Sequence, residues 1–309
     1  MPDQISLFPE SFPLFDNSLK KDTGSDRKQE KSSLDEFFSR TKASQNAEGY
    51  FNLLKFITRF TNYSPLNCYL IHTQNPYSSY VTTANQWLKK FGRRVNPEAR
   101  PIVILAPMSP VLFVYDVADT EGEPLPTALA APLDTKGNIS QTIWNNTIDN
   151  CARDLIKVYE SEVAVPGSEC VKALEKAKLA QVSEDEIYAA LYSIQINKKH
   201  SISQKYAAAV HELAHLYCGH IGSDKTAWWT DRQDHITTRV QREIEAESIS
   251  YIVCKRQNIE TPAAEYLIGD ANQSVELPEF SLDTVLRVAS HIEGMGRRVV
   301  KKRKKKVAP

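Results

Sequence analysis

The sequence lacks any run of the roughly 20 apolar residues that a membrane-spanning helix needs. Its first residues lack a basic segment followed by an apolar run, so we expect no signal peptide. It has only five cysteines, and their odd number and lack of a CxxC pair favour reduced thiols over a disulfide framework. Internal repeats are absent too. These absences predict a cytoplasmic protein with no membrane partner.

The length of 309 residues is sufficient for two ordinary domains. The chain is 41% hydrophobic and 25% charged, which is typical of a soluble globular protein. Helical and β-rich patterns both occur, so we expect an α+β fold. The expected divisions are a disordered arm over 1–32, a first domain over 33–130, a second domain over 140–295 and a basic tail over 296–309.

The two ends of the chain carry possible partner motifs. Gln4-Ile5-Ser6-Leu7-Phe8 resembles the motif by which bacterial proteins dock on the replication sliding clamp, with Gln4, Leu7 and Phe8 as its contacts. Alternatively, these apolar residues fold back on the protein. Arg297 to Lys306 holds eight basic residues, which leaves 30 basic and 38 acidic residues elsewhere, a net charge of −8. This tail is expected either to attract nucleic acid or only to keep the chain soluble.

Residues 51–106 combine cations with aromatic side chains. The segment holds seven basic residues, a single acidic residue (Glu98), and nine aromatic residues between Phe51 and Phe91. Such a composition is expected of a surface that binds single-stranded DNA, because bases stack on aromatic rings while cations follow the phosphates. The alternative, which composition alone favours, is a core of aromatics with a solvated basic rim. The candidate DNA contacts are Arg59, Trp87, Lys89, Lys90, Arg93 and Arg94.

The most informative motif is His211-Glu212-Leu213-Ala214-His215. Residues four apart share one helix face, so His211 and His215 can both ligate one metal ion. Glu212 lies beside that face, where it can act as a general base on a metal-bound water. The apolar flanks predict a buried helix, in which two imidazoles and a carboxylate are costly unless a metal or other partners satisfy them. The motif therefore predicts a zinc site of the metallopeptidase type.

A third ligand is expected from a later helix. The metzincin pattern fails, because it needs Gly where Cys218 stands and His where Ile221 stands. An acidic cluster, Glu243, Glu245 and Glu247, lies on a later apolar helix. Glu243 and Glu247 share one face, and Glu245 points about 200° away. Spacing alone does not choose between them.

Two resemblances extend this interpretation. The pattern from His211 to His220, followed by Glu245-Ala246, is similar to ImmA/IrrE metallopeptidases, and the resemblance assigns Glu245 as the third zinc ligand. Where that family usually has Asn, this chain has Glu247. The first domain resembles the N-terminal DNA-binding domain of ArdC-type antirestriction proteins, which implies binding of single-stranded DNA. The matching stretches are 60–70, 87–94, 102–107 and 114–126.

The resemblances imply a zincin-like second domain and a zinc metalloendopeptidase, gluzincin-like, associated with single-stranded DNA of a mobile genetic element. Glu212 would be its base, and Tyr251, His220 and His235 are candidates to stabilise an oxyanion. We also expect Ile194 to Asn197 to form an edge strand that holds an extended substrate. The alternative is a non-proteolytic antirestriction protein that protects DNA and uses zinc structurally. A regulator that cleaves one repressor is a third hypothesis.

Overall fold

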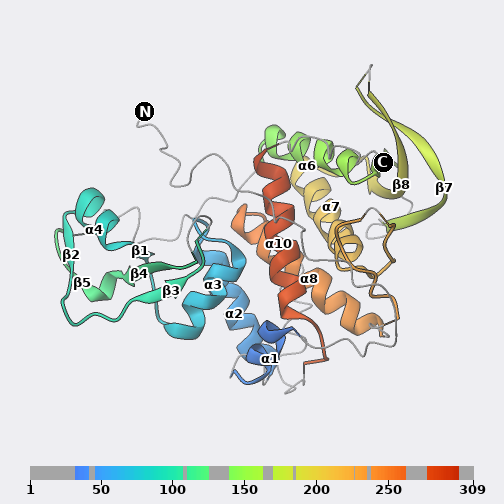
Figure 1. The fold of residues 1–309 in the computed structure, drawn as a ribbon. Coiled ribbons are helices and arrows are strands. Elements are labelled where there is room, and N and C mark those ends of the chain that lie inside the picture. The colour runs from blue at the N-terminus through green and yellow to red at the C-terminus, as the bar shows by residue number, and fades with distance from the viewer. Residues whose placement is uncertain are drawn as a thin grey trace, which may run out of the picture. The chain divides into compact units, whose positions relative to one another are not determined.

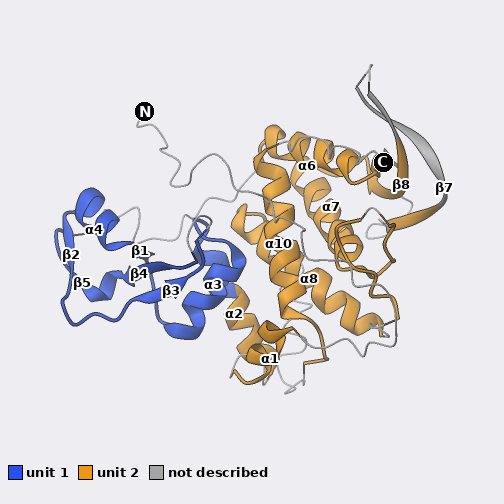
Figure 2. Ribbon diagram, viewed as in Figure 1, with its two compact units in different colours: residues 1–30, 55–134 blue, residues 31–54, 135–309 orange. Residues whose placement is uncertain are grey.

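The computed structural model describes residues 32–41, 46–106, 110–124, 139–162, 170–183, 186–225, 227–234, 238–261 and 277–298. The chain divides into two compact units (Figures 1 and 2). Unit 1 takes residues 55–134 with the chain start, and unit 2 takes residues 31–54 and 135–309. Residues 33–54, expected in the first domain, thus group with the second unit. Among the described residues, no helix combines the length and apolar character needed to cross a membrane.

Unit 1 places two helices beside two small antiparallel sheets. The helices are α3 (Pro65–Gln74) and α4 (Ala84–Phe91). Strands β1 (Val81–Thr82), β4 (Leu112–Asp116) and β3 (Ile102–Ile104) form one sheet in the order β1-β4-β3. Strands β2 (Arg93–Val95) and β5 (Thr120–Gly122) form the other, and the 3-10 turn η2 (Val117–Asp119) precedes β5.

Local sequence signals set the helix boundaries in unit 1. Ser64 caps α3 and Thr83 caps α4, because each side-chain oxygen accepts a hydrogen bond from a first-turn backbone N–H. Pro65 opens α3, where its fixed φ suits the first turn. Gly92 ends α4 with a φ of 61°, a left-handed conformation that glycine adopts without strain. The chain can therefore pass directly from α4 into β2.

Unit 2 is built from helices and a three-stranded sheet. Helices α1 (Ser33–Ser39), α6 (Gln141–Arg153), α7 (Ile202–Tyr217), α8 (Arg239–Arg256) and α10 (Leu282–Arg297) belong to it, and α2 (Ala47–Arg59) passes from unit 2 into unit 1. Strands β6 (Ile156–Ser161), β8 (Glu186–Asn197) and β7 (Cys170–Ser183) pair in the order β6-β8-β7. β6 is parallel to β8, and β7 is antiparallel to it.

The mixed helices and small sheets confirm the expected α+β class. Helix α6 ends at Arg153, because Asp154 caps it and Leu155 turns the chain with a φ of 60° into β6. The strand expected at the sheet edge, Ile194 to Asn197, belongs to β8, which is central among the described strands. The edge-strand prediction was therefore wrong, and β6 and β7 are the edges.

Helices α7 and α8 form the centre of unit 2 and begin alike. Each starts with a capping box, Ser201 with Gln204 in α7 and Thr238 with Gln241 in α8. Each also buries an apolar face of small and branched side chains, most of them fully buried. The two helices lie in direct contact, which brings the polar residues along their facing surfaces together. The candidate site lies on those surfaces.

Candidate metal centre

Helix α7 presents the two motif histidines on one face. The Nε2 atoms of His211 and His215 are 3.2 Å apart, as the spacing of one helical turn predicts. Both rings are partly exposed. The helix ends two residues later, where Cys218 is the cap and Gly219 continues with a φ of 77°. The prediction that these two imidazoles converge is confirmed.

A carboxylate from α8 faces the same point. The Oε2 atom of Glu243 lies 3.7 Å from His211 Nε2 and 3.6 Å from His215 Nε2. Two donors that each lie about 2.0–2.1 Å from a tetrahedral zinc ion are about 3.3–3.4 Å apart. The three observed separations are close to that value. His211, His215 and Glu243 therefore form a ligand set that fits one divalent ion.

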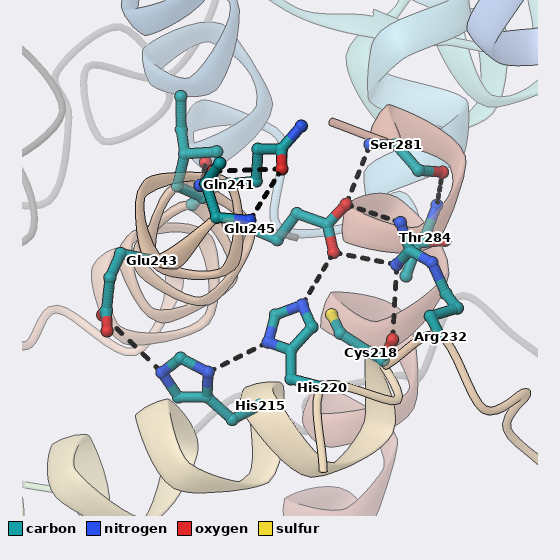
Figure 3. Close-up of polar contacts among 12 residues, drawn as sticks. His215, Cys218, His220, Arg232, Gln241, Glu243, Glu245, Ser281 and Thr284 are labelled. Atoms are coloured by element: carbon teal, nitrogen blue, oxygen red, sulfur yellow. Dashed lines mark hydrogen bonds and ion pairs between the residues drawn. The ribbon is translucent and has the colours of Figure 1, made fainter. Parts of the chain in front are cut away.

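Glu245 belongs to a different cluster (Figure 3). Its side chain is fully buried, and Arg232 donates to both of its oxygens at 2.8 Å. His220 Nε2 lies 3.0 Å from Oε2, and the backbone N–H of Ser281 donates to Oε1 at 2.9 Å. The structure thus does not bring Glu245 to His211 and His215, the position that the family resemblance assigned to it. The physical reason is the helical spacing, since Glu245 leaves α8 on the side away from Glu243.

Cys218, His220 and Glu245 also lie close enough together to suggest a second metal group. The bidentate pairing of Glu245 with the Arg232 guanidinium already neutralises this carboxylate. A cation placed beside Arg232 would be repelled by its charge. We therefore assign this cluster a structural role rather than metal binding.

The charges around the centre are set by burial and by the facing helices. Burial and the neighbouring His215 lower the pKa of His211 to about 4, so its ring is neutral at pH 7, the form that binds metal. The facing ring of His215, whose Nε2 lies 3.6 Å from Oε2, holds the pKa of Glu243 below its ordinary value. Burial and the charge of Glu243 raise the pKa of Glu247 to about 7. Burial alone would raise the pKa of Glu245, but hydrogen bonds from His220 and Arg232 bring it below its ordinary value.

Glu212, the expected general base, is nearly buried and contacts strand β7. Its Oε2 accepts a hydrogen bond of 2.7 Å from the backbone N–H of Val171.

The sequence analysis also named three candidates to stabilise an oxyanion. His220 is bonded to Glu245, and Tyr251 is buried with its ring 5.2 Å from that of Phe51. His235 lies outside the described residues.

In unit 1, three of the candidate DNA contacts are structural. Trp87 is fully buried and donates its ring N–H to the Tyr115 carbonyl, so it cannot stack on a base. Arg93 makes four hydrogen bonds to oxygens of residues 120, 122 and 123. Arg59 donates to the Ser78 carbonyl and lies over the rings of Phe56 and Phe60. For Trp87 the alternative of a buried aromatic core is correct, whereas Arg59 and Arg93 are held by hydrogen bonds and do not form the solvated rim of that alternative.

The other three candidates, Lys89, Lys90 and Arg94, are exposed. They follow one another closely, at the end of α4 and in β2. Their cations are therefore exposed to solvent, and their contact with DNA stays a prediction. The clamp-type motif at Gln4, Leu7 and Phe8 lies outside the described residues, as does the tail beyond Arg298.

Sequence reasoning missed two parts of the site. Arg232 and Ser281 come from segments without a motif, and only the fold brings them to Glu245. His220 was predicted only as a candidate to stabilise an oxyanion, and its contacts with His215 and Glu245 were missed. Its signal was Gly219, whose left-handed turn lets the His220 N–H donate to the His215 carbonyl and brings the two rings together.

Comparisons with known proteins give distant relatives. No protein-family model matches the chain. An uncharacterized protein of Bacillus anthracis is 22% identical over 263 residues, which cover 72% of this chain and 43% of that relative. The chain thus spans less than half the length of the curated relative that it matches.

Two solved structures are similar, both of the antirestriction protein ArdC from the R388 plasmid. The Mn(II)-bound form is 13% identical with a TM-score of 0.33, covering 75% of this chain and 80% of that one. The metal-free form is 14% identical with a TM-score of 0.35, covering 76% and 82%. Similarities of this extent assign no function to this chain. The resemblances of the sequence to ArdC-type proteins and to ImmA/IrrE metallopeptidases stay predictions.

Proposed function

We propose that α7 and α8 bind one divalent metal ion through His211, His215 and Glu243. The observation that carries this proposal is the convergence of two imidazole nitrogens and one carboxylate oxygen at mutual distances of 3.2, 3.6 and 3.7 Å. Lone pairs facing one another at this range repel unless a cation or a proton lies between them. A divalent ion satisfies all three donors at once.

The donor set favours zinc. Two imidazoles and one carboxylate are the protein ligands of many zinc sites that leave a fourth position open to water or substrate. Manganese and cobalt accept the same donors, and the cell's metal supply also decides which ion is bound. Titration of chelator-treated protein with Zn²⁺ and with Mn²⁺ separates these cases. If neither ion binds, the proposal of a metal site is contradicted.

For the protein as a whole, we infer a DNA-protecting function of the antirestriction type on single-stranded DNA of a mobile genetic element. Its support is the resemblance of unit 1 to ArdC-type DNA-binding domains, together with the exposed cations Lys89, Lys90 and Arg94. In this function the metal ion ties α7 to α8 and stabilises unit 2. Protection of this kind needs binding and no bond cleavage.

The test is the salt dependence of single-stranded DNA binding. The triple variant Lys89→Gln, Lys90→Gln and Arg94→Gln removes three exposed cations of unit 1. If each one contacts a phosphate, the slope of log K against log salt falls by about 2, since each such contact contributes roughly 0.7. A charge-matched control changes exposed lysines of unit 2, namely Lys172, Lys198 and Lys199, to Gln. Equal slopes for the two triple variants would contradict the assignment.

A second candidate, a metallopeptidase, is favoured by the position of Glu212. It follows a metal ligand on α7 and bonds to Val171 of β7, an edge among the described strands. A substrate segment added to that edge would lie near this carboxylate. A bound zinc ion lowers the pKa of its water to about 7 and polarises a carbonyl. Glu212 would accept the proton of the attacking water and return it to the departing amine.

The variant Glu212→Gln separates the two functions, because it keeps the shape of the side chain but removes the base. If the protein is a peptidase, this variant retains the metal and loses cleavage of a casein-type substrate, assayed with and without single-stranded DNA. If it only protects DNA, the variant protects as well as the wild type. Full cleavage by Glu212→Gln would remove Glu212 from any mechanism.

A further inference from the structure

His215 uses its second ring nitrogen in a contact that the proposed metal centre does not require. Its Nδ1 lies 2.9 Å from Nδ1 of His220. On the other side of the His220 ring, Nε2 lies 3.0 Å from Oε2 of Glu245. A continuous chain of hydrogen bonds therefore leads from His215 through His220 to a fully buried carboxylate (Figure 3).

The carboxylate end of this chain is held rigidly. Arg232 donates hydrogen bonds to both oxygens of Glu245, and the backbone N–H of Ser281 donates a third. Arg232 also donates to the Cys218 carbonyl, just beyond the end of α7. A carboxylate with these charge-assisted bonds is ionised and can only accept hydrogen bonds.

The direction of every bond in the chain follows from that end. Because Glu245 only accepts, His220 must carry its proton on Nε2. A neutral His220 ring then accepts at Nδ1, and the proton shared with His215 must belong to His215 Nδ1. His215 Nε2 is left with its lone pair, and this is the nitrogen that faces His211 and Glu243.

We propose that His220 and Glu245 are positioning residues, which fix the tautomer and orientation of His215 so that its Nε2 points at the metal. This inference rests on the proposed metal centre. Outer hydrogen bonds of this kind orient ligating histidines and raise their basicity. Here the carboxylate acts through a second histidine instead of touching the ligand directly.

The same logic gives each glutamate of the α8 cluster its own role. Glu243 faces the two Nε2 atoms. Glu247, one turn later on the same face, has Oε1 3.5 Å from the Nδ1 of His211. Glu245, on the other side of α8, reaches His215 through His220. The spacing of two residues between successive glutamates thus supplies one ligand and two outer partners from a single helix.

The first test reads the tautomers in the metal-free wild type by long-range proton–nitrogen NMR of the histidine rings. The expected result is a proton on Nδ1 of His215 and on Nε2 of His220. A proton on Nε2 of His215 would overturn the proposal. This measurement needs neither a metal nor a variant, so it does not depend on how well a substitution folds.

The second test measures Zn²⁺ affinity by competition with a chelating dye. His220→Phe keeps the ring but removes both nitrogens, and affinity is expected to fall about 10- to 100-fold. His220→Asn places an acceptor oxygen where Nδ1 lies, and it should recover most of the loss. The matched control is Tyr217→Phe, which removes a buried hydrogen bond to Asp154 at the same end of α7 without touching His215.

The spectrum of the Co²⁺-substituted protein provides a further comparison. It should change in His220→Phe and stay as in wild type in Tyr217→Phe, because only the first alters the orientation of a ligand. Equal affinities and spectra for the two variants would refute the positioning role. Failure of the wild type to bind any metal would instead refute the proposed centre, and the two failures are therefore distinguishable.

Discussion

Gly219 occupies a position that no larger residue can take without moving the backbone. Its φ is 77°, and a Cβ built there would lie 2.0 Å from the Thr230 carbonyl oxygen and 3.1 Å from the Arg232 nitrogen. Both contacts are backbone atoms, so no side-chain rotation can relieve them. Gly219→Ala therefore tests whether the turn after α7 is packed against the segment that carries Arg232.

The magnitude follows from two costs. A left-handed conformation costs a residue with a Cβ about 1–2 kcal/mol, and forcing an additional carbon into a packed site costs about 1–3 kcal/mol. A total near 3 kcal/mol lowers the melting temperature of a unit of this size by roughly 6–12 °C. The backbone movement that relieves these contacts would also displace His220 and Arg232, so the affinity for the metal should fall as well.

Gly294 provides the control within the same unit. It lies in the last turn of α10, and a Cβ there meets no atom within 4 Å. Gly294→Ala should raise the free energy of unfolding by about 0.5–1 kcal/mol, because alanine favours the helix. Thermal melts followed by circular dichroism measure both variants. A Gly219→Ala protein that melts at or above the wild-type temperature would refute the reasoning.

The remaining predictions concern a buried ion pair, unit 1 and the metal. Arg256→Met leaves the buried carboxylate of Glu293 without this partner, and it should lower the free energy of unfolding in urea melts by about 3–5 kcal/mol. Adding Glu293→Leu should recover most of this loss. Equal losses in the single and double variants would contradict the prediction. Arg93→Gln should destabilise unit 1 but leave single-stranded DNA affinity unchanged while the protein is folded, and reduced affinity would show that Arg93 contacts DNA. Metal at about 100 times its Kd should stabilise the protein by about 2.7 kcal/mol, and a melting temperature insensitive to EDTA would contradict this.

The sequence predicts helix α7 well because two independent signals coincide there. The spacing of His211 and His215 fixes one face, and Gly219 fixes the end of the helix. The acidic cluster on α8 was also visible. Which glutamate turns toward α7 was not, because helical spacing separates Glu245 from Glu243 but does not say which face packs against the neighbouring helix. That choice depends on long-range packing.

The DNA-binding candidates show a similar limit in unit 1. Composition places Trp87, Arg93 and Lys89 in one group of candidate DNA contacts. It cannot distinguish the buried ring of Trp87 and the hydrogen-bonded guanidinium of Arg93 from the exposed cation of Lys89. The β-rich run around Ile194 was identified, whereas its place at the centre of the sheet depends on β7, which carries no clear signal of its own. Pairing partners distant in the sequence decide such positions.

The central claim is that three side chains from α7 and α8 hold one divalent ion. The most direct measurement is the metal content of the purified chain by mass spectrometry, for wild type and for Glu243→Gln and Glu245→Gln after dialysis against a weak chelator. We predict one ion per wild-type chain, a large loss in Glu243→Gln and a smaller one in Glu245→Gln. A wild-type chain without metal, or a Glu243→Gln variant that retains it fully, would contradict the account.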